Sequence, residues 1–358
     1  MSRVPDSPAF EKKWSAVNMI KDQRTLLLFC IVGLSIITYF VNPRFADPMN
    51  IIALIGSISV TGVMTMGMSK VLLSGGVDLS IGNIMTLSAS TMAMLIVGST
   101  QGTVGGRADT DEMVYVVADS DTGITSVPVA IIIGMLVAVG CGFLNGIIIT
   151  KTKTMPLIIT LGTGMIFQGL SLIITTGRFM GFKMAFEPLR LTRLDIGNVP
   201  IPVTLFFFIG IVILTWVLVN RTKYGRRIVA IGGNEMNARL SGISVDKYKI
   251  ITYVITGALC GLAAIIYASR LDSIKSDSGA GMELEALVSA IIGGVTFDGG
   301  KGTISGAFLG VLFMGLISNS MNMMQVNSYY QRLIRGIIIV VAVVISNIDN
   351  IRKEFGLR

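Results

Sequence analysis

Few side chains in this sequence have types and spacings that could carry out chemistry. The 358 residues include no histidine, no nucleophile beside a general base, and no cluster of soft metal ligands. Cys30, Cys141 and Cys260 all lie within apolar segments, which is typical of packing residues rather than of a disulfide framework. We therefore predict a protein that is not an enzyme, with no catalytic residues, no metal site and no cofactor.

The larger polar side chains in and beside the apolar segments include neutral amides. Amides of this kind hydrogen-bond the hydroxyl groups of a small polar solute, and they also join helices to one another in lipid. Helix joining is the favoured interpretation for any one of them, while contact with a solute stays open for one or two. The amides are Asn83, Asn145, Gln168, Asn319, Asn322 and Gln325.

The composition places these groups in a membrane. The mean hydropathy is +0.74, and only 14% of the residues are charged, against roughly 25% in a soluble domain. The net charge of +8 is spread between apolar segments, which argues against nucleic acid as a partner. We predict an all-α polytopic membrane protein with lipid as its solvent.

A helix needs roughly 20 residues to cross a bilayer, and by this measure the sequence contains ten candidate membrane spans. The eighth is short and is predicted to cross or to be re-entrant. The segments are 25–41, 50–69, 80–99, 127–150, 155–176, 202–220, 250–268, 284–297, 303–321 and 332–348.

The loop charges predict the orientation. With the N-terminus inside, most loop lysines and arginines lie inside, Lys70 at the end of the second segment among them. Both termini are then cytoplasmic. The chain divides into an N-terminal segment (1–24), which is an interfacial helix or a tail, a membrane domain (25–348) and a C-terminal tail (349–358). Within the membrane domain, 101–126 is an acidic outer loop and 221–249 is a basic inner loop.

Two glycine-rich breaks, 73–82 and 292–303, interrupt the apolar segments. Non-helical backbone at membrane depth is tolerated only inside protein or beside a water-filled cavity. Each break is therefore predicted to face a pathway or to pack deep between helices. Capping of the next helix is the favoured role for Asp78 and Ser80. The candidates for shaping a pathway are Gly75, Gly76, Asp78, Ser80 and Asn83.

The second break is not a phosphate-binding loop. That pattern needs glycine, four residues, then Gly-Lys-Ser/Thr, whereas here Gly300 precedes Lys301 and Gly302 follows it. No ATP site is predicted in this chain.

A short helix is predicted within the inner loop. Asn234 is suited to cap its N-terminus, Glu235 suits the positive end of the helix dipole, and Gly242 suits the left-handed residue that follows a helix. Such a helix on the inner face indicates a docking site for another protein. The candidates for that contact are Gly233, Asn234, Glu235, Asn237, Ala238, Arg239 and Gly242.

Taken in order, the motifs carry a family resemblance. Gly75-Gly-Val-Asp-Leu-Ser80, the stretch 230–243, Glu283-Leu-Glu-Ala286, Gly293-Gly-Val and Gly299-Gly-Lys-Gly302 follow one another along the chain. The sequence resembles the permease subunits of ribose/galactose-type ABC importers over nearly its whole length. The acidic loop 101–126 is longer than is usual for that family.

The resemblance implies a fold and partners. The fold is that of a type II ABC importer permease with about ten spans in a bacterial inner membrane. The partners are a cytoplasmic ABC ATPase, an extracytoplasmic sugar-binding protein and a second permease copy or paralogue. The helix around Asn234–Leu240 would be the coupling helix that seats on the ATPase.

The function implied is translocation of a monosaccharide, a pentose or a hexose. Two alternatives stay open: an ABC permease for a nucleoside, a sugar-like signal molecule or a branched amino acid, and a self-contained facilitator for a small polar solute. Flux through a facilitator would not need the helix at 234–240.

Overall fold

The computed structural model describes residues 23–97, 124–191, 193–196 and 199–346. Three expectations therefore lie wholly or mostly outside the described residues: the interfacial N-terminal segment, the acidic outer loop and the C-terminal tail.

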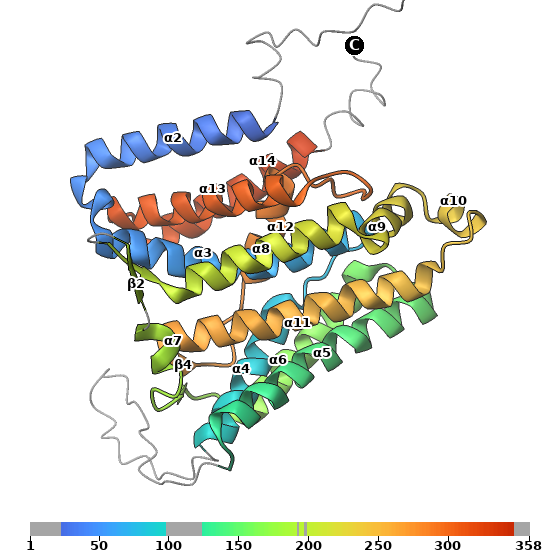
Figure 1. Cartoon of the computed structure of the whole chain (residues 1–358), viewed down its shortest axis with the longest axis horizontal. Coiled ribbons are helices and arrows are strands. Elements are labelled where there is room, and N and C mark those ends of the chain that lie inside the picture. Colours follow the sequence, from blue (N-terminus) through green and yellow to red (C-terminus); the bar gives the residue numbers. More distant parts are fainter. Residues whose placement is uncertain (1–22, 98–123, 192, 197–198, 347–358) are drawn as a thin grey trace, which may run out of the picture.

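Long helices that run side by side make up most of the described chain (Figure 1). Seven of the described helices are long and apolar enough to cross a membrane: α2 (Gln23–Val41), α3 (Pro48–Leu73), α5 (Val127–Thr152), α6 (Pro156–Thr175), α8 (Val203–Arg221), α11 (Val245–Leu271) and α13 (Ile304–Met323). Three further apolar helices are α4 (Ile81–Val97), α12 (Met282–Ile292) and α14 (Ser328–Ser346). Each of the ten predicted segments contains one of these helices, so the chain is a polytopic membrane protein.

Short elements occupy the connections. They are the 3-10 helix η1 (Pro43–Ala46), the helices α7 (Glu187–Leu191), α9 (Lys223–Gly233) and α10 (Glu235–Leu240), and the strands β1 (Met180–Gly181), β2 (Arg193–Ile196), β3 (Val199–Pro202) and β4 (Ser273–Ile274). β1 pairs antiparallel with β4, with Met180 opposite Ile274, and β2 pairs antiparallel with β3. The β1–β4 pair ties the connection after α6 to the end of α11.

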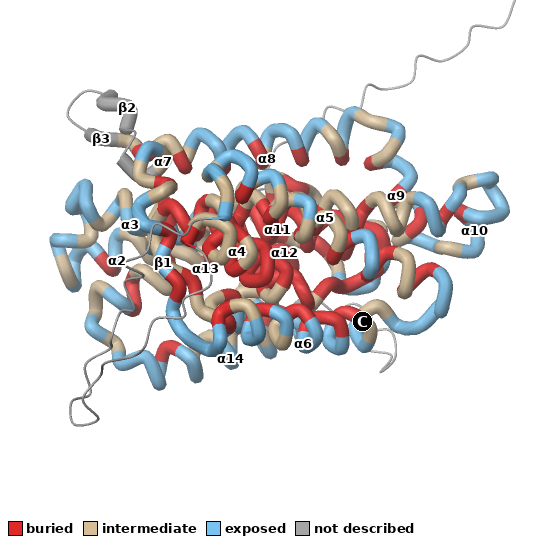
Figure 2. The backbone as a smooth tube through the Cα atoms, turned by 90° about the horizontal axis from the view of Figure 1, so that it is seen from below, coloured by how far each residue is buried: buried red, intermediate tan, exposed pale blue. Residues whose placement is uncertain are grey.

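Helices α3 and α11 form the centre of the bundle. The most apolar stretch of α3 is 67% buried within the chain, while that of α2 is 11% buried. Figure 2 shows the buried backbone gathered in the middle, with exposed backbone around it. α11 packs closely on α5, since a Cβ atom added to Gly257 would lie 2.3 Å from the Ala138 carbonyl oxygen. This is the close helix approach that small residues permit in membranes.

α4 and α12 are shorter than a full crossing, with 17 and 11 residues. A non-helical stretch precedes each of them, and their N-terminal ends meet inside the bundle. The Gly279 amide, just before α12, donates to Oγ1 of Thr86 in α4 over 2.9 Å. A Cβ atom on Gly82 would lie 2.3 Å from the Gly279 carbonyl oxygen. The start of α4 is therefore packed closely against the loop that leads into α12.

Lys70 is not in an inner loop, and that part of the prediction was wrong. α3 continues to Leu73, beyond the predicted end at 69, and this places Lys70 in its last turn. The side chain is 1% exposed. The error arose because a lysine after an apolar run indicates a helix end, whereas here the whole side chain, including its ammonium group, is buried within the bundle.

We predict that Gly257→Ala destabilises the bundle, because the added methyl group would overlap the α5 backbone. The loss should be about 1–3 kcal/mol, the range for overpacked cores. Thermal unfolding of the detergent-purified protein measures it. Gly162→Ala on α6 is the matched control, since no atom lies within 4 Å of its added Cβ. Equal melting temperatures for the two variants would contradict the close α5–α11 contact.

Candidate functional site

Helix α10 begins where the sequence predicted. Asn234 is its N-cap, and its side-chain oxygen accepts a hydrogen bond from the Asn237 amide over 2.9 Å. The N-cap carbonyl also accepts from the Ala238 amide at 3.0 Å. Asn234 therefore ends α9 and starts α10, and it fixes the angle between the two helices.

The end of α10 is equally well defined. Gly242 has a φ of +78°, a left-handed conformation that suits glycine. The Ile243 amide donates to the Ala238 carbonyl and the Gly242 amide to the Arg239 carbonyl, both over 3.0 Å. This is the double hydrogen bond of the Schellman motif. Ile243 and Ala238 belong to one apolar cluster with Ile231 and Val245, which anchors the end of the helix.

Ion pairs fasten α10 to the start of α11. Glu235 accepts hydrogen bonds from Arg239 at 2.9 Å and from Lys249 at 2.5 Å, and Arg239 also contacts Asp246 at 2.5 Å. Partial burial favours the neutral form of Glu235, but the hydrogen bonds and positive charges of Lys249 and Arg239 outweigh it and lower its pKa. Hydrogen bonds to Asp246 and Glu235 raise the pKa of Arg239. Glu235 and Arg239 are therefore both charged at neutral pH.

The outward surface of α10 is apolar. Met236 and Leu240 lie one turn apart and are 65% and 79% exposed, whereas Ala238 is buried. Large exposed side chains at the tip of a short, well-anchored helix are typical of a protein contact surface. The sequence prediction missed Met236 and Leu240, although their spacing of four within a polar helix was visible. Ala238 was predicted as a contact residue but supports the helix from within.

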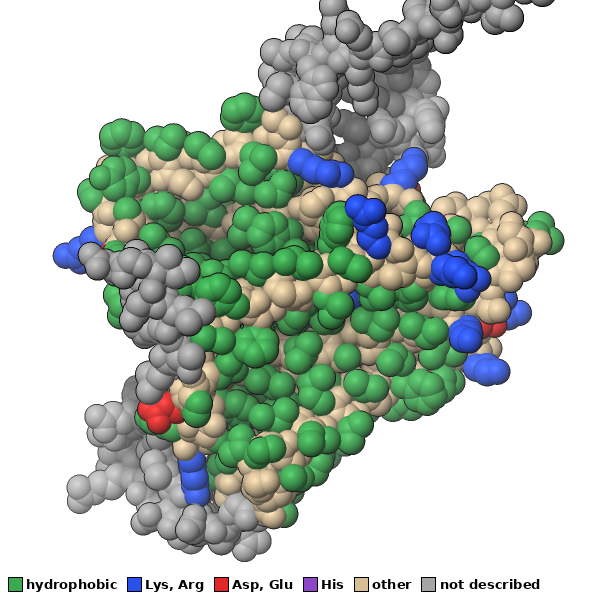
Figure 3. All heavy atoms as spheres, in the orientation of Figure 1, with side chains coloured by type: hydrophobic (Ala, Val, Ile, Leu, Met, Phe, Trp, Pro, Cys, Tyr) green, Lys and Arg blue, Asp and Glu red, His purple; other side chains and the backbone are tan. Residues whose placement is uncertain are grey.

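Basic side chains surround the α9–α10 end of the molecule. Figure 3 shows lysine and arginine gathered at that end, while hydrophobic side chains cover the long faces of the helices. Lys223, Arg226 and Arg227 of α9 are exposed, and Ile228 and Ile231 of the same helix are buried. α9 is therefore an amphipathic helix that leads from α8 to α10.

The first break, residues 74–80, lies inside the bundle. Asp78 and Ser80 are fully buried, and Oδ1 of Asp78 accepts from the Ser80 amide at 3.0 Å and from its hydroxyl at 2.5 Å. Asn145 of α5 donates to the Ser80 hydroxyl over 2.8 Å. Asp78 therefore forms a turn just before α4 instead of facing an open channel.

Two other helices hold the same break. Tyr253 of α11 donates to the Val77 carbonyl over 3.3 Å, and the Leu79 amide donates to Oγ1 of Thr160 in α6 over 3.1 Å. Gly75 is exposed and has a φ of +76°.

The other two pathway candidates are Gly76, within this break, and Asn83, in the first turn of α4. Gly76 is buried against the Tyr253 hydroxyl, since a Cβ on Gly76 would lie 2.8 Å from it. Asn83 is half-buried on α4, and its amide nitrogen would lie 3.2 Å from a Cβ on Gly164 of α6. The five pathway candidates thus lie within residues 75–83, and Gly75 and Asn83 are the least buried of them.

Several of the predicted amides join helices. Asn319 of α13 and Asn50 of α3 exchange hydrogen bonds of 2.8 and 3.2 Å. Asn322 accepts from Gln331 of α14 over 2.9 Å. Helix joining, the favoured interpretation, is thus confirmed for Asn319 and Asn322.

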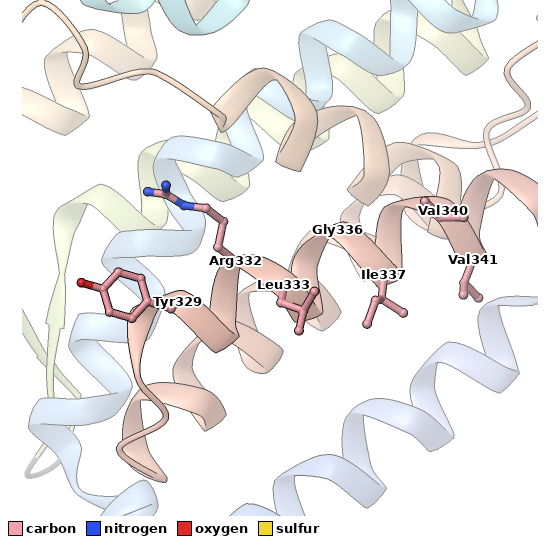
Figure 4. Close-up of a pocket in the computed structure, with 7 residues that line it drawn as sticks. All are labelled: Tyr329, Arg332, Leu333, Gly336, Ile337, Val340 and Val341. Carbon is pink, nitrogen blue, oxygen red and sulfur yellow. The ribbon is translucent and has the colours of Figure 1, made fainter.

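A groove of 630 Å³ lies along the outer face of α14 (Figure 4). Its lining residues all come from this one helix: Tyr329, Arg332, Leu333, Gly336, Ile337, Val340 and Val341. None of the predicted pathway residues lines it. The groove is therefore a surface feature and not a channel through the chain.

A helical bundle with broken helices inside it and a short helix displayed at one end is the architecture of a membrane permease. The chain belongs to the family described as "Branched-chain amino acid transport system / permease component", whose model matches residues 50–343.

Curated relatives match almost the whole chain. The ribose import permease of Bacillus subtilis (strain 168) is 36% identical over 321 residues, which cover 89% of this chain and 90% of the relative. The ribose import permease of Escherichia coli (strain K12) is 31% identical over 342 residues, 94% of this chain and 96% of the relative. The galactose/methyl galactoside import permease of the same strain is 29% identical, over 89% of this chain and 92% of the relative. No solved structure matches the chain.

We predict that Glu235→Gln loosens α10, because the variant keeps the size of the side chain but removes the charge that binds Lys249 and Arg239. Ion pairs of this exposure contribute up to about 1 kcal/mol, so amide exchange at 235–242 should rise roughly twofold to fivefold. Hydrogen-exchange mass spectrometry measures it. Lys247→Ala, at an exposed position outside the network, is the control, and equal exchange in both variants would contradict the anchoring role.

Proposed function

We propose that this chain is the membrane-spanning subunit of an ATP-binding cassette importer for a monosaccharide, a pentose or a hexose. The observation that carries the proposal is the match to ribose and galactose import permeases over about nine tenths of each chain. The family description mentions branched-chain amino acids, but the relatives cited above are named for sugars. A nucleoside or a sugar-like signal molecule is the runner-up cargo within the same architecture.

The proposed partner at α10 is a cytoplasmic ABC ATPase. Support comes from the exposed Met236 and Leu240, which offer an apolar anchor, and from the caps and ion pairs that hold the helix in place. Gly233, Asn234, Glu235, Asn237, Arg239 and Gly242 then act mainly by shaping and fixing this helix. The exposed basic residues of α9 support a cytoplasmic location for this end, by the positive-inside rule.

The proposed pathway is completed by a second permease copy or paralogue. Burial of the first break among α5, α6 and α11 supports this, because Asp78 and Ser80 do not face open space within one chain. Gly75 and Asn83, the least buried of the pathway candidates, are proposed to face the solute. An extracytoplasmic sugar-binding protein would deliver the solute on the side opposite α10, with both termini of the permease cytoplasmic in a bacterial inner membrane.

We predict that Met236→Ser combined with Leu240→Ser abolishes ATP-dependent uptake, because the ATPase would lose its apolar contact. A fall of about tenfold or more is expected for the loss of two central anchor residues. The measurement is uptake of labelled ribose, allose and galactose into proteoliposomes that contain the permease, its ATPase and its binding protein. Met49→Ser is the control, since Met49 has the same 65% exposure and lies on α3 rather than on α10.

Uptake that persists without ATP, at the same rate in the wild type and the double variant, would overturn the importer proposal and favour a self-contained facilitator. ATP-dependent uptake of a nucleoside, with none of the three sugars carried, would keep the architecture and change the cargo.

A further inference from the structure

Three segments that are far apart in the sequence meet at a single point beside α10. They are the end of α3 at Leu73, the end of α9 at Gly232, and the second break at Gly300. The Gly300 amide donates to the Leu73 carbonyl over 3.2 Å. A Cβ atom added to Gly232 would lie 2.1 Å from that carbonyl oxygen and 2.6 Å from the Gly300 nitrogen. Gly232 therefore packs directly on the hydrogen bond that joins the other two segments.

Neighbouring glycines extend the contact in both directions. A Cβ on Gly299 would lie 2.8 Å from the Gly75 Cα, and a Cβ on Gly300 would lie 2.6 Å from the Gly233 Cα. Gly299 and Gly300 have φ values of +87° and +69°, which L side chains rarely adopt. No side chain separates the three backbones here. We call this contact the glycine junction and define it by Leu73, Gly75, Gly232, Gly299 and Gly300.

The junction connects both glycine-rich breaks to α10. Gly232 lies two residues before Asn234, the N-cap of α10. Leu73 ends α3, and the break that follows leads into α4. The second break joins α12 to α13. A displacement of α10 would therefore be transmitted through one contact both to the break between α3 and α4 and to the break between α12 and α13.

We propose that Gly232 is a positioning residue for transport, which makes α10, the first break and the second break move as one body. This inference rests on the proposed function and goes beyond it, because ATPase docking on α10 does not by itself specify which parts of the permease move with that helix. Where two backbone segments are in direct contact, no side chain can change rotamer when one segment is displaced, so the other segment must move with it. A methyl group at position 232 would push the end of α9 away from both breaks.

The test compares uptake with ATP hydrolysis in the same proteoliposomes. For Gly232→Ala, we expect the amount of sugar carried per ATP hydrolysed to fall about tenfold, a typical coupling free energy between distant sites. ATP hydrolysis stimulated by the loaded binding protein should persist, since α10 is unchanged. Gly210→Ala on α8 is the control, because no atom lies within 4 Å of its added Cβ. If Gly232→Ala lowers uptake and ATP hydrolysis by the same factor, the amount of sugar carried per ATP is unchanged. That result indicates a purely structural defect and would overturn the proposal.

A second measurement keeps Gly232 unchanged, so it tests the proposal even if the Gly232→Ala variant does not fold. Spin labels at Arg226 on α9 and Lys301 in the second break, both exposed, report the distance between the two segments. We expect the same distance in the nucleotide-free and the nucleotide-trapped transporter. A change of about 5 Å, one helical turn, would show that the segments slide apart and would overturn the proposal. Failure of the wild-type complex to import any sugar with ATP would instead overturn the proposed function.

Discussion

The structure depends on one constraint: backbone that leaves the helical conformation inside a membrane must find its hydrogen bonds within the protein. The first break meets this constraint with partners from two helices, because Tyr253 of α11 bonds to the Val77 carbonyl and Thr160 of α6 bonds to the Leu79 amide. Asn145 of α5 adds a bond to the Ser80 hydroxyl. The second break bonds to the end of α3 through Gly300. Broken helices are therefore possible here only because the surrounding helices are placed to satisfy them, and this requirement fixes how α5, α6 and α11 pack.

Features that depend on local sequence were predictable. Hydropathy located all ten apolar segments, and the type and spacing of Asn234 and Gly242 defined both ends of α10. Contacts between distant segments were not predictable, since nothing near Gly232 in the sequence indicates Leu73 or Gly300 as its neighbours. Lys70 was misplaced for the same reason: its burial depends on α11 and the rest of the bundle, and not on the residues beside it. The residues of the proposed glycine junction are thus the ones that a single sequence does not reveal.

Helix α10 combines two properties that rarely occur together in so short an element. Six residues are too few to form a stable helix in isolation, because nucleation is unfavourable. Here the N-cap, the Schellman motif, the ion pairs and the buried Ala238 supply what length does not. The outward side chains Met236 and Leu240 are largely exposed and are therefore available for the docking proposed above.

The use of glycine at the junction has a mechanical consequence. Larger residues at these positions would separate the segments and replace a backbone contact with side chains, whose rotamers change within nanoseconds and thereby dissipate small displacements. An allosteric signal needs an element with two discrete arrangements, and a tightly packed contact favours such behaviour because it does not deform continuously. A second close contact of this kind joins Gly82, at the start of α4, to Gly279, just before α12. Under the proposal, movement delivered at α10 would thus reach the middle of the helical bundle through two glycine contacts and the chain between them.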